Sequence, residues 1–189
     1  MKSTLVVFGG GGFIGGNLCT IALRGGWQVL TSSRRQHAAI PAARWRQVDV
    51  TDASAVQRLL AEERPEAVVD LAAVADIDRA QSEREAARAV NVEAARVMAQ
   101  ACAELGAAFL YLSSDAVFSG AAGEYREEDP VEPVNYYGET KAEGERPVLA
   151  AHPGAAVVRI SLALGFPVTD GNSFLAALDG TDRARRQDR

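Results

Sequence analysis

Short apolar segments alternate with helix-forming segments along most of this chain. The apolar segments predict strands at residues 4–8, 27–31, 46–50, 67–71, 108–112 and 155–160. The intervening segments predict helices at residues 13–24, 53–63, 83–105 and 137–149, the last disturbed at Pro147, and a loop at residues 116–134. Apolar strands that are joined through helices run parallel and are buried on both faces. The alternation therefore predicts an α/β fold, a doubly wound parallel sheet whose ligands bind at the carboxyl ends of the strands.

Length, charge and cysteine content limit the possible functions. With 189 residues, 48% of them hydrophobic, the chain is long enough for one domain with its own core. The formal net charge of −5 argues against nucleic acid as a partner. No leader pattern or membrane-length apolar stretch is visible, so we expect a cytoplasmic protein without a membrane partner. Cys19 and Cys102 lack disulfide or metal-ligand spacing, and we expect both to be buried as small hydrophobic residues.

A glycine-rich loop follows the first predicted strand and opens the first predicted helix. Its sequence is GGGGFIG, in which Gly9, Gly12 and Gly15 are spaced three residues apart and Phe13 and Ile14 begin the helix. Glycine lets the backbone turn tightly and approach a pyrophosphate, which the free N–H groups of a helix N-terminus attract. A glycine-rich turn without a ligand is the alternative, but the strand and helix on either side favour a Rossmann-like dinucleotide site.

The end of the second predicted strand bears on the choice of cofactor. There the sequence continues Ser33-Arg34-Arg35, without the acidic residue that often binds the adenosine ribose of NAD. Two guanidinium groups are suited to a 2′-phosphate, which favours NADP(H), with NAD(H) as a possibility. Alternatively, both arginines are ordinary solvated surface residues.

Two further strand ends are candidates for contact with the cofactor. Asp49, followed by Val50, is placed to accept a hydrogen bond from an adenine amino group, although an aspartate that only forms a turn is equally compatible with the sequence. Leu71, Ala72 and Ala73 end the fourth strand, and small side chains there leave room for the ribose and pyrophosphate, although alanine is equally suited to packing.

The clearest chemical signal is a tyrosine and a lysine four residues apart. Tyr137 and Lys141 would lie on one helix face, and a nearby ammonium lowers the pKa of a phenol, whose ordinary value is about 10. The same ammonium is suited to bind the nicotinamide ribose. Only Lys2 and Lys141 are lysines in a chain rich in arginine, which suggests a specific need for an ammonium. Ser114, at the end of the fifth strand, offers a hydroxyl to a substrate carbonyl.

Taken together, these features resemble the extended short-chain dehydrogenase/reductase family, with the greatest likeness to its dTDP-4-dehydrorhamnose reductases. The likeness extends over residues 4 to about 175. Its most specific parts are residues 71–106, which include Asn91, residues 112–120 with the sequence LSSDAVFSG, and residues 124–145, which end in YGETKAEGE.

The resemblance implies roles for individual residues. By position, Tyr137 is the proton donor, Lys141 its partner, Ser114 the hydroxyl that polarises the carbonyl, and Asn91 a cofactor-site residue. The implied reaction transfers a hydride from NADPH to the C4 ketone of a nucleotide sugar. Two features depart from the reductase pattern. Ala116 replaces a common aromatic residue, and the glycine loop is more similar to that of epimerases and dehydratases.

The resemblance also implies a division of the chain. We expect a dinucleotide-binding domain at residues 1–165, whereas residues 166–189 would be a remnant of the family's substrate-binding lobe and a charged tail, disordered at residues 179–189. Without most of that lobe, the chain is expected to bind cofactor but to reduce nucleotide sugars poorly. Apolar surface should be exposed near Leu162, Leu164 and Phe166, open to a second copy of the chain or another partner.

Two alternatives to a reductase stay open from the sequence. One is a nucleotide-sugar epimerase or dehydratase that uses bound NAD. The other is a non-catalytic dinucleotide-binding subunit, as in the regulatory subunit of methionine adenosyltransferase, which shows the same kinship to sugar reductases.

Overall fold

A computed structural model describes residues 3–36 and 40–169, and its centre is a parallel sheet. The sheet has six strands in the order β3-β2-β1-β4-β5-β6, and every pairing between neighbours is parallel. The strands are β1 Thr4–Phe8, β2 Gln28–Ser33, β3 Arg44–Gln47, β4 Ala67–Asp70, β5 Ala108–Ser114 and β6 Ala156–Ile160. The chain crosses from one half of the sheet to the other between β3 and β4, which confirms the predicted doubly wound topology.

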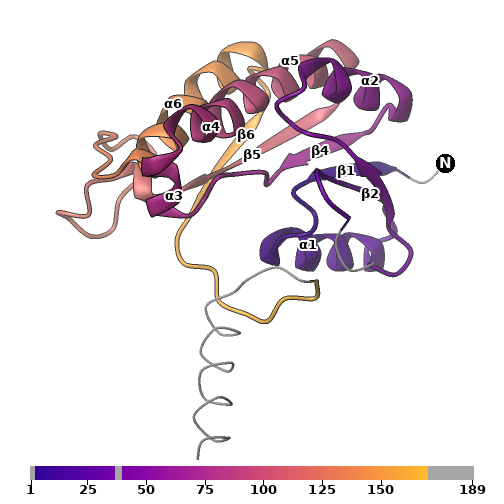
Figure 1. Ribbon diagram of the computed structural model, residues 1–189, viewed down its shortest axis with the longest axis horizontal. Helices are drawn as coiled ribbons and strands as arrows, with labels where there is room; N and C mark the ends of the chain where they lie inside the picture. The colour runs from indigo at the N-terminus through magenta and orange to yellow at the C-terminus, as the bar shows by residue number, and fades with distance from the viewer. Residues whose placement is uncertain (1–2, 37–39, 170–189) are drawn as a thin grey trace, which may run out of the picture.

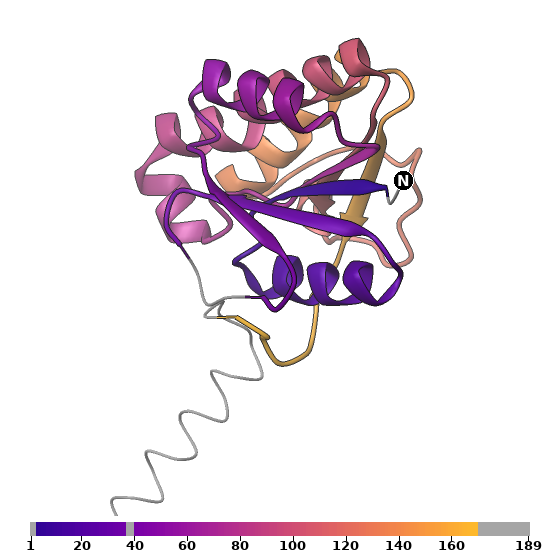
Figure 2. The ribbon, with the colours of Figure 1, turned by 90° about the vertical axis from the view of Figure 1, so that its right-hand side faces the viewer.

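Helices cover the two faces of the sheet unequally. They are α1 Phe13–Arg24, α2 Ala53–Glu63, α3 Ile77–Ser82, α4 Arg84–Arg88, α5 Ala95–Leu105 and α6 Tyr136–Ala151, with a π-helical turn η1 at Ala89–Ala94 and a 3₁₀ turn η2 at Asp115–Val117. Figures 1 and 2 show α1 on one face and α2, α5 and α6 on the other. In the described part of the chain, α1 is therefore the only helix on its face.

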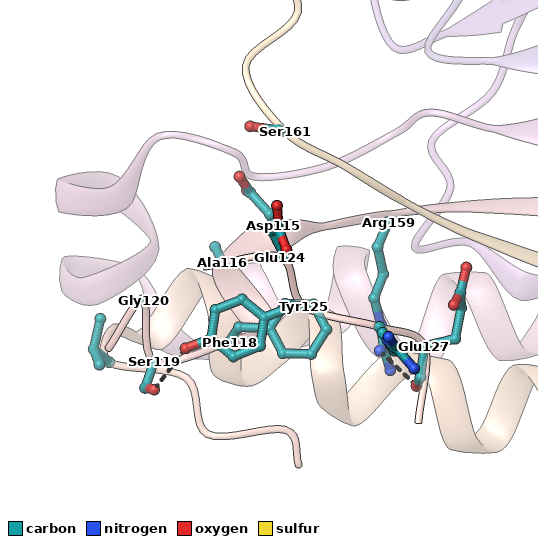
Figure 3. Close-up of a pocket in the computed structure, with 12 residues that line it drawn as sticks. Asp115, Ala116, Phe118, Ser119, Gly120, Glu124, Tyr125, Glu127, Arg159 and Ser161 are labelled. Carbon is teal, nitrogen blue, oxygen red and sulfur yellow. Dashed lines mark hydrogen bonds between the residues drawn. The ribbon is translucent and has the colours of Figure 1, made fainter. Parts of the chain in front are cut away.

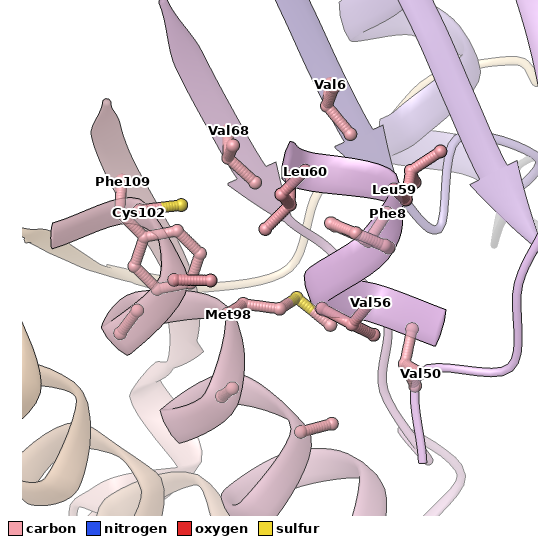
Figure 4. Packing of buried hydrophobic residues seen from close by; sticks show 14 of the residues in the cluster. Val6, Phe8, Val50, Val56, Leu59, Leu60, Val68, Met98, Cys102 and Phe109 are labelled. Carbon is pink, nitrogen blue, oxygen red and sulfur yellow. The ribbon is translucent and has the colours of Figure 1, made fainter. Parts of the chain in front are cut away.

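The larger hydrophobic core lies between the sheet and the helices α2, α5 and α6. Phe8 and Val68 project from the strands toward Leu60 and Met98 of the helices, and these side chains are almost completely buried (Figure 4). Burying a side chain of this size contributes about 1.5–3 kcal/mol. A smaller cluster under α1 includes Leu5, Val7, Cys19, Val29 and Ile40.

Three local differences from the sequence-based expectation have physical causes. The third strand ends at Gln47 instead of reaching residue 50, yet Val50 is buried in the loop that follows. The helix α3 was not predicted. It begins because the Asp76 carboxylate accepts a hydrogen bond from the N–H of Arg79. The helix α6 continues through Pro147, since the buried Val148 anchors its last turns.

The predicted helix at residues 83–105 exists but is not uniform. It consists of α4, the π-helical turn η1 and α5 in direct succession, and Asn91 lies in the π-helical turn. Such turns are rare within α-helices and are frequent near functional sites.

The cysteines are buried as predicted, and both are free thiols. Burial raises the pKa of Cys19 to about 11 and that of Cys102 to about 12. Both are thus protonated and unreactive at neutral pH. Among the described helices, none is long and apolar enough to cross a membrane.

The segment after β6 exposes apolar side chains, as the sequence predicts. Leu162, Leu164 and Phe166 are each at least 60% exposed. The segment runs toward α1, where Asn17 donates a hydrogen bond to the carbonyl of Phe166 (Figure 1). The predicted charged tail at residues 179–189 lies outside the described residues.

Candidate functional site

The glycine loop joins β1 to α1, and a side chain would have a different effect at each of its glycines. Gly9 has a φ of +80°, and a Cβ there would lie 2.8 Å from the carbonyl carbon of Leu71. A Cβ on Gly15 would collide with the carbonyl oxygen of Gly9 and lie 2.7 Å from the Cα of Gly10. A Cβ on Gly12 would meet only the Gly9 oxygen, at 3.4 Å, which is an ordinary contact. Gly9 and Gly15 are therefore required by packing, whereas Gly12 leaves space that the fold itself does not fill.

A cavity of about 250 Å³ opens beside Gly12, between the ends of β1, β2 and β4. It is lined by Gly9, Gly12, Ser32, Ser33, Arg34, Val48, Val50, Leu71, Ala72, Ala73, Val74, Arg79 and Val90. The hydroxyl of Ser32 is buried and, within the described residues, has no hydrogen-bond partner. A buried polar atom without a partner is rare, so this hydroxyl indicates a ligand contact. Sequence reasoning missed Ser32, because it is one of several small polar residues at the end of β2 and nothing in the sequence shows that its hydroxyl is buried.

The neighbouring cavity, of about 690 Å³, is basic. Arg34, Arg35 and Arg79 line it together with Gly12 and Ser33. Arg79 was not predicted, because the short helix that carries it was not. It forms an ion pair with Glu83, at 3.0 Å, which fixes its guanidinium at the rim of the cavity.

Two predicted cofactor residues have their side chains engaged within the protein. The Ser33 hydroxyl donates to the carbonyl of Arg35, at 2.7 Å, and accepts from the indole of Trp45, at 3.0 Å. The Asp49 Oδ1 accepts from the N–H and the hydroxyl of Thr51, and the backbone bond is the main cause that lowers the pKa of Asp49. The turn-forming role of Asp49 is thus realised, and its adenine contact stays a prediction.

Asn91 is fully buried, and both ends of its amide are occupied. Its Oδ1 accepts from the N–H of Val74, at 2.9 Å, and its Nδ2 donates to the hydroxyl of Thr140, at 2.9 Å. Asn91 therefore ties the loop after β4 to α6, so that any effect of this residue on a cofactor acts through the positions of its neighbours.

The three predicted catalytic residues meet in one cavity of about 310 Å³. Ser114 at the end of β5 and Tyr137 and Lys141 on α6 line it, opposite Phe13 and Ile14 at the start of α1. Leu71 lines both this cavity and the one beside Gly12. The glycine loop and the predicted catalytic residues therefore border a continuous region at the carboxyl edge of the sheet.

The phenol of Tyr137 keeps its proton at neutral pH. Burial raises the pKa of Tyr137, a hydrogen bond with Ser114 opposes the rise, and the charge of Asp115 adds to it. The sequence led us to expect a pKa lowered by Lys141, and in this structure that expectation is wrong. The Lys141 Nζ lies instead over the ring of Tyr111, 3.9 Å from its centroid.

Lys141 is buried beside carboxylates that the sequence analysis did not consider. Its side chain is 2% exposed, and burial lowers the pKa of Lys141 to about 8, against the opposing charges of Asp70 and Glu145. Asp70 is equally buried, at the end of β4. No sequence signal marked Asp70, because a polar residue at a strand end is common and its distance from α6 in sequence hides their proximity.

A larger cavity of about 610 Å³ lies beside η2, whose Asp115 and Ala116 line it (Figure 3). It is lined by Asp115, Ala116, Phe118, Ser119, Gly120, Glu124, Tyr125, Arg126, Glu127, Val134, Arg159 and Ser161. Phe118 and Tyr125 stack with their centroids 4.4 Å apart, and Arg159 lies over the Phe118 ring. Ser161 lines both this cavity and the one that holds Tyr137.

Comparison with known proteins places the chain in a family. The model of the RmlD substrate binding domain matches residues 1–187. The chain belongs to this family. A dTDP-4-dehydrorhamnose reductase of Streptomyces griseus is 42% identical over 146 residues, which are 76% of this chain and 47% of that protein. The methionine adenosyltransferase 2 subunit beta of Bos taurus is 40% identical over 122 residues, 65% of this chain and 36% of that protein.

A solved structure of the same kind agrees with the fold of this RmlD-family chain. The dTDP-4-dehydrorhamnose reductase of Bacillus anthracis str. Ames, crystallised in complex with NADP, matches 97% of this chain and 61% of its own, with a TM-score of 0.84 and 29% identity. This chain spans about half the length of the curated reductases that it matches.

Proposed function

We propose that this chain binds NADP(H) and supplies the active site for reduction of the C4 ketone of a nucleotide sugar. The observation that carries the proposal is the cavity in which Ser114, Tyr137 and Lys141 meet the first turn of α1. The relatives named as dTDP-4-dehydrorhamnose reductases support this substrate class. In this proposal residues 1–165 form the cofactor-binding part, and residues 166–189 begin the substrate-binding part.

The residues around the glycine loop fit a dinucleotide. Gly12 leaves space beside the N-terminus of α1, and the unpartnered hydroxyl of Ser32 faces the same cavity. Arg34, Arg35 and Arg79 make the adjoining cavity basic, which favours a 2′-phosphate and hence NADP(H) over NAD(H). The dinucleotide, when bound, supplies the hydride for the ketone carbon.

Three side chains then act on the ketone and its surroundings. Tyr137, which retains its proton because its pKa is raised, donates that proton to the ketone oxygen as the alkoxide forms. Ser114 lines the same cavity, and its hydroxyl, which donates to the Asp115 Oδ1 at 3.2 Å in this structure, turns to donate to the ketone oxygen and stabilises the developing negative charge. Lys141 adds a buried positive charge at this edge of the sheet.

The cavity of Figure 3 is the proposed position for the rest of the substrate. It shares Ser161 with the catalytic cavity, and it offers carboxylates to sugar hydroxyls and the guanidinium of Arg126 to a diphosphate, whereas that of Arg159 is paired with Glu145. We infer that a nucleotide sugar extends from Tyr137 toward Phe118 and Arg126.

Arg34→Ala should weaken NADP(H) more than NAD(H). Loss of a charge-assisted contact to the 2′-phosphate corresponds to about 1.5–3 kcal/mol, or about 10- to 100-fold in Kd. Titration of both cofactors by intrinsic fluorescence measures the two constants. Arg58→Ala, at an exposed arginine on α2, is the matched control. Equal binding of NADP(H) and NAD(H) by the unmodified chain would favour the epimerase or dehydratase alternative.

An interaction role is a second candidate, favoured by the exposed apolar segment after β6. Phe166 is 64% exposed, and relatives of this chain include subunits of methionine adenosyltransferase. We propose that a second copy or another protein covers Leu162, Leu164 and Phe166.

The purified chain should therefore self-associate weakly, with a Kd on the order of micromolar. Sedimentation velocity measures the association, and Phe166→Ser should weaken it. A monomer at every concentration, with no change on substitution, would leave self-association without support.

A further inference from the structure

A buried carboxylate at the end of β4 is only half satisfied. Asp70 is 2% exposed, and its Oδ1 accepts a hydrogen bond from the N–H of Ala72, at 3.0 Å. Its Oδ2 is buried and has no hydrogen-bond partner within the residues that the structure describes. An ionised carboxylate in such a place is costly unless a positive charge lies close by.

Lys141 is the cation whose position allows it to compensate the charge of Asp70. Asp70 pairs in register with Tyr111 on β5, and the ring of Tyr111 lies beneath the Lys141 Nζ. The Tyr111 hydroxyl donates to the carbonyl of Asn91, at 2.8 Å, which fixes the ring between the two strands and α6. The Asp70 carboxylate, the Tyr111 ring and the Lys141 ammonium therefore form one buried group, to which β4, β5 and α6 each contribute a residue.

The other carboxylate near Lys141 is already neutralised. Glu145 accepts from Ser113, at 2.6 Å, and its two oxygens accept from the guanidinium of Arg159, at 3.0 and 2.7 Å. The remaining titratable groups that interact with Asp70 are Cys102 on α5 and Tyr111 on β5, whose raised pKa values keep them uncharged at neutral pH. Asp70 is thus the carboxylate whose charge is not balanced by an arginine.

We propose that Asp70 is a positioning residue that keeps Lys141 in its ammonium form at the active site. The role assigned to Lys141 rests on the function proposed above, but the charge coupling does not. Burial lowers the pKa of Lys141 to about 8, and the charge of Asp70 opposes this fall. Burial likewise raises the pKa of Asp70 to about 6, and Lys141 opposes the rise. Each group therefore supports the charge of the other between about pH 6 and 8.

The small number of lysines makes the proposal directly measurable. Only Lys2 and Lys141 are present, so lysine labelled with ¹³C at Cε gives two resonances, which Lys2→Arg assigns. Lys141 of the unmodified chain should titrate near pH 8. Asp70→Asn, which still accepts from Ala72, should lower that midpoint by about one pH unit or more, a tenfold lower ratio of ammonium to amine.

Asp52→Asn is the matched control. It removes the same charge from an exposed helix cap, where asparagine caps equally well, and should leave the Lys141 midpoint unchanged. An unchanged or higher midpoint in Asp70→Asn would overturn the proposal.

The unmodified chain provides a second test if Asp70→Asn does not fold. The Lys141 resonance should show a smaller step near pH 6, where Asp70 titrates. Absence of that step would also overturn the coupling. An enzyme assay then distinguishes the two proposals. If Asp70 and Lys141 titrate as a coupled pair but the chain reduces no ketone, the proposed function is rejected, whereas the effect of Asp70 on the charge of Lys141 still holds.

Discussion

Tyr137→Phe should slow ketone reduction by about 10²- to 10⁴-fold, the usual contribution of a positioned proton donor. The phenylalanine ring keeps the packing of a residue that is largely buried between α6 and the end of β5, but it has no proton to give. Ser114 would retain its hydrogen bond with the N–H of Ala116, at 3.1 Å, so the strand end should keep its shape. NADP(H) binding should change little.

Single-turnover reduction of dTDP-4-dehydrorhamnose, followed through NADPH absorbance with protein in excess, measures this loss even where turnover is slow. Tyr136→Phe is the matched control on the preceding residue of α6, where the hydroxyl contacts only the carbonyl of Arg84 in the described structure. It should leave the rate unchanged. A Tyr137→Phe chain that reduces the ketone at the original rate would exclude the phenol as the proton donor.

Gly12→Val should reduce dinucleotide affinity by about a hundredfold or more and leave the fold intact. The added side chain would project into two cavities, where it would displace a pyrophosphate from the N-terminus of α1. Each charge-assisted hydrogen bond lost contributes about 1.5–3 kcal/mol. The fold should tolerate the change, because a Cβ on Gly12 meets only the Gly9 oxygen at 3.4 Å and the φ of Gly12 is −75°.

Isothermal titration with NADPH measures the affinity, and thermal unfolding measures the fold. Gly123→Val, in the open loop before α6 where a Cβ would meet no atom within 4 Å, is the matched control for both measurements. Unchanged affinity in Gly12→Val would mean that the glycine loop is only a turn.

Much of the fold follows from local pattern, because each apolar run and each helix carries its own periodicity. All six strands were placed correctly or within a few residues. The largest error is at the end of β3, since Val50 is buried in a loop and looks like a strand residue in sequence. The short α3 was missed, because six residues carry too little periodicity and the cap at Asp76 is its main signal.

The candidate site was predictable only where a spacing carries the chemistry. Tyr137 and Lys141 are one helical turn apart, and a spacing of four residues reveals this directly. The contacts of Ser32 and Asp70 depend on which strands are neighbours and which face a side chain takes, and no local pattern encodes either. The pKa of Tyr137 was predicted in the wrong direction for the same reason, because burial raises it and the ammonium of Lys141 lies over the ring of Tyr111 on β5.

The π-helical turn Ala89–Ala94 allows the geometry of the site to change while the helix content of the protein stays the same. Deleting one residue there would restore a continuous α-helix, and circular dichroism would register almost no loss. Because the π turn accommodates one extra residue, α4 and α5 would keep their relative orientation, and only the side chains within the turn would change direction. Asn91 would then leave Val74 and Thr140 and release the loop after β4 from α6. Single insertions or deletions in η1 can therefore change the contacts at this edge of the sheet during evolution, without changes in the core against which α5 packs.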